Sequence, residues 1–225
     1  MRFDPTGCAI FFPIAGQPFS VFPERSKAIK RKSKSMIDHF RVLAPIYDRM
    51  IPVVDPEIYR SLLDLPAQGS MLDVGGGTGR VSAPLQQWVK HLVVADVSRA
   101  MLRRAQKRGG MWPVRSMAER LPFADGVFDR VLAADALHHF RSQSVAVKEL
   151  IRVLSHGGRM VVEEPDITRP LIRLLALMEK LAMMKSRFLS AEIIAEMAKG
   201  PGITSKIVRD GKWLSWVIIF KEKTR

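Results

Sequence analysis

The chain of 225 residues contains little cysteine and few acidic side chains. Its single cysteine, Cys8, excludes an internal disulfide, and its five histidines come without any Cys-x-x-Cys spacing, so no metal site is predicted. Neither of two strongly apolar segments suits a membrane span: residues 8–22 are short and contain prolines, and residues 169–187 carry too many charges. The strongest charge follows the first apolar segment, whereas a signal peptide has it in front. A reducing, cytoplasmic location fits this composition.

The scarcity of acidic residues leaves a large positive charge. There are 36 Lys and Arg against 22 Asp and Glu, which gives a net charge of +14. This charge favours anionic partners such as nucleic acid, acidic lipid surfaces or anionic small molecules, but it is equally compatible with a solvated basic surface. The hydrophobic content of 47% and charged content of 26% are typical of one globular domain of this length.

Residues 1–35 differ in character from the remainder. They hold seven basic and two acidic side chains, and Pro13 and Pro18 interrupt their apolar part. We expect a poorly ordered basic extension, with a domain over residues 36–225 and Met36 as a possible true start. A basic tether to a membrane surface is the alternative interpretation.

The rest of the chain is organised around residues 70–80. The short apolar run Met71–Val74 predicts a buried parallel strand, and Gly75, Gly77 and Gly79 then allow a tight turn and a close approach of a ligand to the backbone. Residues 80–88 can form a helix with Pro84 in its first turn. A strand, a glycine turn and a helix are the layout of a nucleotide-binding βα unit.

A second acidic position supports this interpretation. Asp96 ends a predicted strand over residues 91–96, about 20 residues after the glycines, where a carboxylate can bind a ribose diol. Ser98 is a plausible N-cap for a helix over residues 99–108. The glycines are spaced G-x-G-x-G, whereas a dinucleotide site has G-x-G-x-x-G, which disfavours a nicotinamide oxidoreductase.

Four further segments carry a family resemblance. Residues 40–48 fit the pattern F-x-x-x-A-x-x-Y-D, and residues 134–140 read Ala-Asp-Ala-Leu-His-His-Phe. Residues 117–129 fit D-A-x-x-L-P-F-x-D-x-x-F-D except at Met117. Residues 150–158 fit L-x-R-V-L-K-P-G-G except at positions 155 and 156. Together with the glycine loop, they resemble the class I S-adenosylmethionine (SAM) methyltransferases of the type 11 group. Within that group the chain is similar to the menaquinone/ubiquinone-biosynthesis C-methyltransferases.

The resemblance implies SAM as the cofactor and assigns its contacts. Asp96 would bind the ribose hydroxyls, the glycine loop would approach the methionine part, and Thr78 would donate to its carboxylate. Met117 stands where the family contacts the adenine amine with a polar side chain, and a thioether is at best a weak acceptor. Tyr47 would lie near the methionine end or, alternatively, be a core tyrosine. The cofactor-binding residues expected are Tyr47, Asp73, Gly75, Gly77, Thr78, Gly79, Asp96, Val97, Met101, Met117, Ala118 and Ala134.

Candidate catalytic residues follow the predicted strand 128–134. Asp135, His138 and His139 come at its carboxyl end, where open α/β sheets bind ligands. Methyl transfer needs a base only when the acceptor must lose a proton, and histidine suits that role near neutral pH. The alternative is that both histidines merely pack or orient the loop.

The resemblance also implies a fold and a range of acceptors. We expect a Rossmann-like, seven-stranded, mostly parallel α/β sheet with helices on both faces and a C-terminal antiparallel pair around Asp210-Gly211-Lys212. A basic, apolar helix over residues 169–187 would cover a small, lipophilic, quinone-precursor-like acceptor and contact an anionic membrane, or simply pack as a core helix. Nucleic acid is not an expected partner. The rival functions are a phospholipid N-methyltransferase and a non-catalytic SAM-binding protein.

Overall fold

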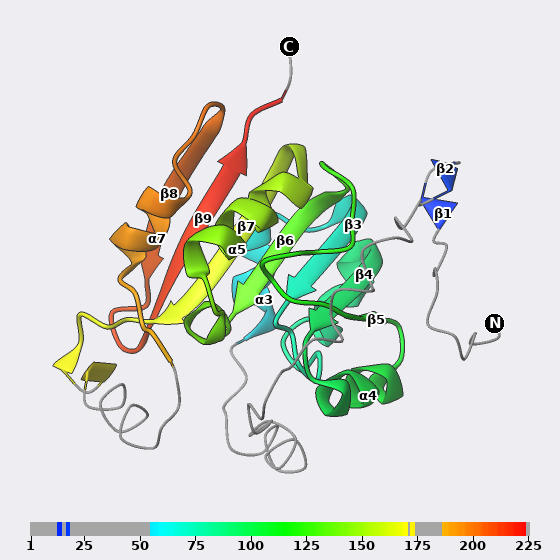
Figure 1. The fold of residues 1–225 in the computed structure, drawn as a ribbon, viewed down its shortest axis with the longest axis horizontal. Coiled ribbons are helices and arrows are strands. Elements are labelled where there is room, and N and C mark those ends of the chain that lie inside the picture. The colour runs from blue at the N-terminus through cyan, green and yellow to red at the C-terminus, as the bar shows by residue number, and fades with distance from the viewer. Residues whose placement is uncertain (1–12, 15–16, 19–54, 171, 174–185, 224–225) are drawn as a thin grey trace, which may run out of the picture.

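The computed structural model describes residues 13–14, 17–18, 55–170, 172–173 and 186–223 (Figure 1). Tyr47, most of the basic extension and the greater part of the predicted helix 169–187 therefore lie outside the described residues. Within residues 1–35, a two-residue pairing joins β1 (Pro13–Ile14) to β2 (Gln17–Pro18). Within these described ranges, no helix combines the length and apolarity needed to cross a bilayer.

The main sheet has seven strands in the order β5-β4-β3-β6-β7-β9-β8. The strands β3 to β7 pair in parallel, and β9 pairs antiparallel with both β7 and β8. This arrangement confirms the predicted mostly parallel sheet with a C-terminal antiparallel pair. The strands are β3 (Ala67–Val74), β4 (Val89–Asp96), β5 (Trp112–Arg115), β6 (Phe128–Ala134), β7 (Leu154–Pro165), β8 (Ile203–Arg209) and β9 (Leu214–Lys221).

Helices cover both faces of the sheet, as the sequence predicts (Figure 1). One face packs against α5 (Gln143–Val153) and α7 (Ala191–Met197). The other packs against α3 (Pro56–Leu63), the 3-10 helix η2 (Ala83–Trp88) and α4 (Arg99–Arg108). Successive strand residues alternate between the two cores, so Val161 faces α3 and Val162 faces α5.

The start of the described domain shows how local sequence sets an element. Asp55 caps α3 by accepting a hydrogen bond from the Glu57 backbone N at 2.9 Å, and Asp64 ends the helix in the left-handed region at φ 56°. The helix buries Tyr59 and Leu63. Helical spacing places Ile58 inward as well, but this expectation is wrong, since Ile58 is 37% exposed.

Other elements differ from the expectations in length or type. The helix predicted over residues 80–88 is a shorter 3-10 helix, which begins beside Pro84. The strand β7 runs from Leu154 to Pro165 and is longer than its apolar run Met160–Val162. The predicted hairpin turn is present, and Asp210 holds it by accepting hydrogen bonds from the backbone N of Lys212, Trp213 and Leu214.

Candidate active site

The glycine loop follows the carboxyl end of β3. Gly75, Gly77 and Gly79 have φ of 75°, 57° and 70°, which L side chains rarely adopt. A Cβ at Gly75 would lie 2.6 Å from that of Ala136, so glycine also permits contact with the turn after β6. A Cβ at Gly77 would have no described atom nearer than 3.9 Å, and Asp96 Oδ2 would be 4.0 Å away. At Gly77 the backbone is therefore open to a ligand beside a carboxylate.

Asp96 is held in place at the carboxyl end of β4. Its Oδ2 accepts a hydrogen bond from the Gly77 backbone N at 3.1 Å, and its Oδ1 accepts one from the Ser98 backbone N at 2.7 Å. These two bonds fix the orientation of the carboxylate, and a carboxylate is the group that accepts hydrogen bonds from the two hydroxyls of a ribose. Ser98 occupies the N-cap position of α4, although its side chain makes no capping bond. The open loop and the oriented carboxylate fit the ribose and methionine parts of SAM.

Asp73 lies beneath the glycine loop. It is 1% exposed, and a Cβ at Gly76 would fall 2.2 Å from its Oδ2. Burial raises the pKa of Asp73 to about 7; the nearby Ser82 hydroxyl lowers it, the Asp96 charge raises it further and Arg80 opposes that rise. No donor among the described residues completes a hydrogen bond of good geometry to either carboxyl oxygen. An orphaned buried carboxyl under the loop is consistent with a ligand-binding end of the sheet.

The remaining residues that we expect to bind the cofactor lie at the same end of the sheet, and they differ in their exposure to solvent. Val97 is 50% exposed and Met117 36%, whereas Met101, Ala118 and Thr78 are buried. Ala134, the last residue of β6, is partly exposed. Of this set, Val97 and Met117 therefore present the most surface to a ligand.

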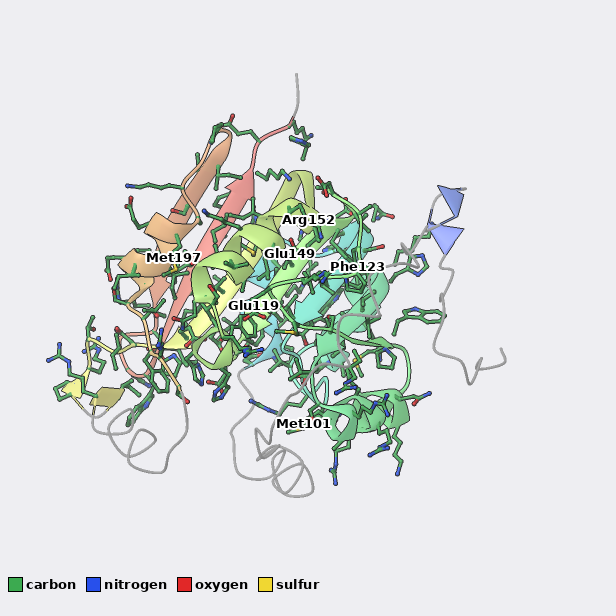
Figure 2. All side chains as sticks on the ribbon, in the orientation of Figure 1. Met101, Glu119, Phe123, Glu149, Arg152 and Met197 are labelled. Atoms are coloured by element: carbon green, nitrogen blue, oxygen red, sulfur yellow. The ribbon has the colours of Figure 1, made fainter. Side chains whose placement is uncertain are left out.

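A charged network joins the segment after Met117 to α5, and Figure 2 labels its members Phe123, Glu149 and Arg152. Arg152 donates hydrogen bonds to Glu149 and to the carbonyl oxygens of Leu121 and Phe123. Glu149 in turn accepts from the Leu121 backbone N at 2.8 Å. This network sets the path of the chain that carries Met117 and Ala118.

The turn after β6 brings the candidate catalytic residues together. Asp135 has φ of 52°, a strained value for a non-glycine residue, and its backbone N donates to the Glu163 carbonyl at 3.0 Å. His138 is 3% exposed, and its Nδ1 lies 2.7 Å from Glu164 Oε2. The rings of His138 and His139 are 4.0 Å apart.

His139 differs electrostatically from its neighbour. Burial, together with the His138 charge, lowers the pKa of His139 to about 3, so its ring stays neutral near pH 7. Its Nδ1 lies 3.3 Å from Ser186 Oγ, in the segment that follows residues 174–185. The two adjacent histidines are therefore in chemically distinct environments.

Two buried carboxyls at the end of β7 were not predicted as site residues. Glu163 Oε2 accepts from the Tyr59 hydroxyl at 2.8 Å and from Trp216 Nε1 at 2.6 Å, and Glu164 pairs with His138. Burial raises the pKa of Glu163 to about 7, opposed by its two donors and assisted by Asp135 and Glu164. The available signal was a pair of acids ending the apolar run Met160–Val162, since buried acids need partners.

Comparison with known proteins relates this chain to methyltransferases. Residues 72–162 match the family model of a methyltransferase domain, type 11. The ubiquinone/menaquinone biosynthesis C-methyltransferase UbiE of Pseudomonas putida is 30% identical over 165 residues, which are 66% of this chain and 64% of that protein. The protein of that name from Ectopseudomonas oleovorans is 29% identical over 160 residues, or 64% of this chain and 94% of its own. The chain thus spans slightly less than two thirds of the first curated relatives that it matches.

Solved structures share the fold at low identity. A SAM-dependent methyltransferase of Thermotoga maritima, described as a possible histamine N-methyltransferase, has a TM-score of 0.63 at 23% identity, covering 81% of this chain and 98% of that chain. A putative methyltransferase from Haloferax volcanii, in complex with the activator Trm112, has a TM-score of 0.67 at 15% identity, covering 84% and 100%.

Residues 72–162 therefore carry a type 11 methyltransferase domain, and the strand order and the glycine loop agree with this class. SAM is the cofactor of this class, which confirms that prediction from the sequence. In sequence, the chain is related to the ubiquinone/menaquinone biosynthesis C-methyltransferases.

Proposed function

We propose that the protein transfers a methyl group from SAM to a small, lipophilic acceptor resembling a quinone precursor. The observation that carries the SAM part is the open backbone at Gly77 beside the oriented Asp96 carboxylate. The sequence relatives are named ubiquinone/menaquinone biosynthesis C-methyltransferases, which supports the acceptor class. A small-molecule acceptor is expected of a methyltransferase of this class, and we propose in addition that the acceptor is lipophilic.

The proposed cofactor contacts are those predicted from the sequence. Asp96 binds the ribose diol, Gly75 to Gly79 with Thr78 bind the methionine part, and Val97 and Met117 flank the adenine. Asp73 lies beneath the loop, Met101 supports the adenine side from α4, and Ala118 and Ala134 complete the wall. Tyr47, outside the described residues, stays a predicted contact at the methionine end.

The chemistry asks little of the protein beyond alignment. Bound SAM supplies a methyl group on a sulfonium, and the electron pair of the broken C–S bond stays on sulfur. The protein orients the acceptor and excludes water. Where the acceptor must lose a proton, a base from the turn after β6 takes it, and we propose His138, because His139 is the ring that burial keeps unprotonated and weakly basic.

Calorimetric titration of SAM tests the cofactor site. Asp96→Ala should weaken SAM binding by about 2–4 kcal/mol, since it removes two charge-assisted hydrogen bonds to the ribose. Glu196→Ala on the exposed face of α7 is a control that should bind like the wild type. Equal affinity of Asp96→Ala and wild type would show that Asp96 does not hold the ribose.

The acceptor can be identified directly. Wild-type protein is incubated with methyl-labelled SAM and a whole lipid extract, and labelled products are separated and identified. A labelled quinone precursor supports the proposal. Label only in a phospholipid headgroup, or only in a water-soluble compound, would contradict the acceptor class while leaving the methyltransferase assignment in place.

A basic helix beside the glycine loop favours contact with an anionic membrane. The helix α4 begins at Arg99, three residues after Asp96. It contains no acidic residue and five basic ones: Arg99, Arg103, Arg104, Lys107 and Arg108. Arg108 Nε donates to the Thr78 carbonyl in the glycine loop at 3.0 Å. Because the outer side of α4 is basic and lies next to the cofactor loop, an anionic bilayer attracted to it would bring a lipophilic acceptor to the same edge.

Vesicle co-sedimentation tests this membrane contact. Replacing Arg99, Arg103, Arg104 and Lys107 by Gln should reduce binding to anionic vesicles by up to about 1 kcal/mol per charge, and salt should weaken wild-type binding. A control with the same charge loss replaces the exposed residues Arg141, Lys148, Lys206 and Lys212 by Gln. Equal loss in both variants would indicate an effect of net charge alone and would reject α4 as the contact.

A further inference from the structure

His138 and Glu164 form a buried dyad at the carboxyl ends of β6 and β7. Glu164 Oε2 lies 2.7 Å from His138 Nδ1, and Glu164 Oε1 accepts from the His138 backbone N at 3.3 Å. The side chains are only 4% and 2% exposed. One carboxylate therefore holds both the ring and the backbone of His138.

The orientation of the His138 ring is set from other sides as well. Phe188 stacks on it with centroids 4.4 Å apart and planes 17° apart, and the His139 ring lies 4.0 Å away. The His138 carbonyl accepts from the Arg187 backbone N at 2.9 Å. Gln143 Nε2 donates to the carbonyls of Leu137 and Arg187, which joins the same two segments. A ring constrained in this way cannot exchange its two nitrogens by rotation without breaking several contacts.

Alternation along β7 separates this dyad from the other buried acid. Glu164 follows Val162 on the face of α5, whereas Glu163 follows Val161 on the face of α3, with Tyr59 and Trp216. The two consecutive carboxyls are similarly buried but have different partners. They provide a matched pair for experiment.

We propose that Glu164 is a positioning residue that keeps a proton on His138 Nδ1, so that Nε2 is the atom that accepts the proton released by the methyl acceptor. A carboxylate at Nδ1 selects this tautomer and stabilises the imidazolium that forms when Nε2 is protonated. This role rests on the proposed function.

The proton balance is simple. The acceptor X–H gives its proton to Nε2, and the X–H electron pair forms the bond from X to the methyl carbon, whose former bonding pair stays on sulfur. The imidazolium, neutralised by Glu164, afterwards returns its proton to water. No oxidant or metal is needed.

The test compares Glu164→Gln with Glu163→Gln by steady-state kinetics against pH. A Gln amide has the shape of Glu but can donate to Nδ1, which would place the ring proton on Nε2. We expect Glu164→Gln to lower kcat by at least about 100-fold and to shift the acidic limb of the kcat profile, with SAM affinity within about twofold of wild type. Glu164→Asp, which keeps the charge, should recover part of kcat and the wild-type limb.

The titratable groups in contact with the His138 ring include Glu164 on β7 and His139 in the same turn. Asp135 precedes that turn, Glu163 lies on the opposite face of the sheet, and the exposed Arg187 lies in the following segment. Glu163→Gln should leave the acidic limb in place. If Glu163→Gln moves the limb as much as Glu164→Gln does, the limb reports buried charge in general, and the assignment to the dyad fails.

A readout independent of turnover completes the test. The ring nitrogens of His138 in ¹⁵N-labelled protein should show a protonated Nδ1 in wild type and in Glu164→Asp, and an altered state in Glu164→Gln. Unchanged nitrogen resonances in Glu164→Gln, or a loss of SAM affinity in step with kcat, would overturn the proposal. If wild type methylates nothing, the proposed function fails, whereas the resonances still decide whether Glu164 sets the tautomer.

Discussion

At the scale of single residues, the buried carboxyls of Asp73 and Glu163 stay protonated at pH values where exposed acids are already ionised. Asp73 and Glu163 are 1% and 3% exposed, and burial raises the pKa of each to about 7. Glu163 has two hydrogen-bond donors, while Asp73 has no completed bond among the described residues. Asp73 should therefore gain the least compensation for ionising in the folded protein.

Stability should consequently depend on pH through Asp73. Its pKa rises from 3.8 in the unfolded chain to about 7 in the fold, so between these values the folded protein binds more protons and its stability falls as pH increases. Asp73→Asn cannot titrate. Its free energy of unfolding, relative to wild type, should improve by about 2 kcal/mol between pH 5 and pH 7 in urea titrations.

The surface variant Glu196→Gln is the control for this measurement and should follow the pH dependence of wild type. Parallel curves for Asp73→Asn and wild type would mean that Asp73 titrates in the fold as an exposed carboxyl does.

At the scale of elements, α5 determines the path of the segment after Met117. The Arg152 guanidinium, whose side chain is 30% exposed, joins Glu149 to the carbonyls of Leu121 and Phe123. A lysine at this position has its three donors on a single nitrogen and cannot reach the separate acceptors that Nε and the two terminal nitrogens of Arg152 contact. Arg152→Lys should reduce the free energy of unfolding by about 1–2 kcal/mol and weaken SAM binding a few-fold, because Ala118 lies on the supported segment.

Asp125→Ala provides the comparison, since it removes another contact to the same guanidinium. The Asp125 carboxylate is 81% exposed, so the loss should be at most about 0.5 kcal/mol. Denaturant unfolding and SAM calorimetry on both variants give the answer. A larger effect of Asp125→Ala than of Arg152→Lys would show that the exposed ion pair dominates.

Elements defined by local signals could be predicted from the sequence. The strand 128–134 and the helix 99–108 have the predicted bounds, because an apolar run and a helix that begins after a serine and ends at a glycine are local patterns. The Tyr59–Glu163 and His138–Glu164 pairs join positions 104 and 26 residues apart, and no periodicity reveals such pairs. Helical spacing alone likewise places Ile58 inward, whereas the helix buries Tyr59, whose hydroxyl donates to the distant Glu163 carboxylate.

At the scale of the whole molecule, the seven-stranded sheet is complete within the described residues after Asp55. The prediction that residues 1–35 are a dispensable extension is still to be tested. A truncated protein beginning at Met36 should keep the melting temperature of the full chain within a few degrees and its SAM affinity within about twofold, because the described residues of both cores all lie after Asp55. A large loss in either quantity would make the extension part of the fold.

The strand order leaves β5 and β8 at the two borders of the sheet. The strand β5 has only four residues, and its Pro113 lacks the amide hydrogen that an incoming strand would need. In β8, Thr204, Ser205 and Lys206 are exposed and polar, with a lysine among them. Short, proline-containing and lysine-bearing borders are poor templates for strand addition. The described sheet is therefore protected at both borders against growing by edge-to-edge self-association into larger aggregates.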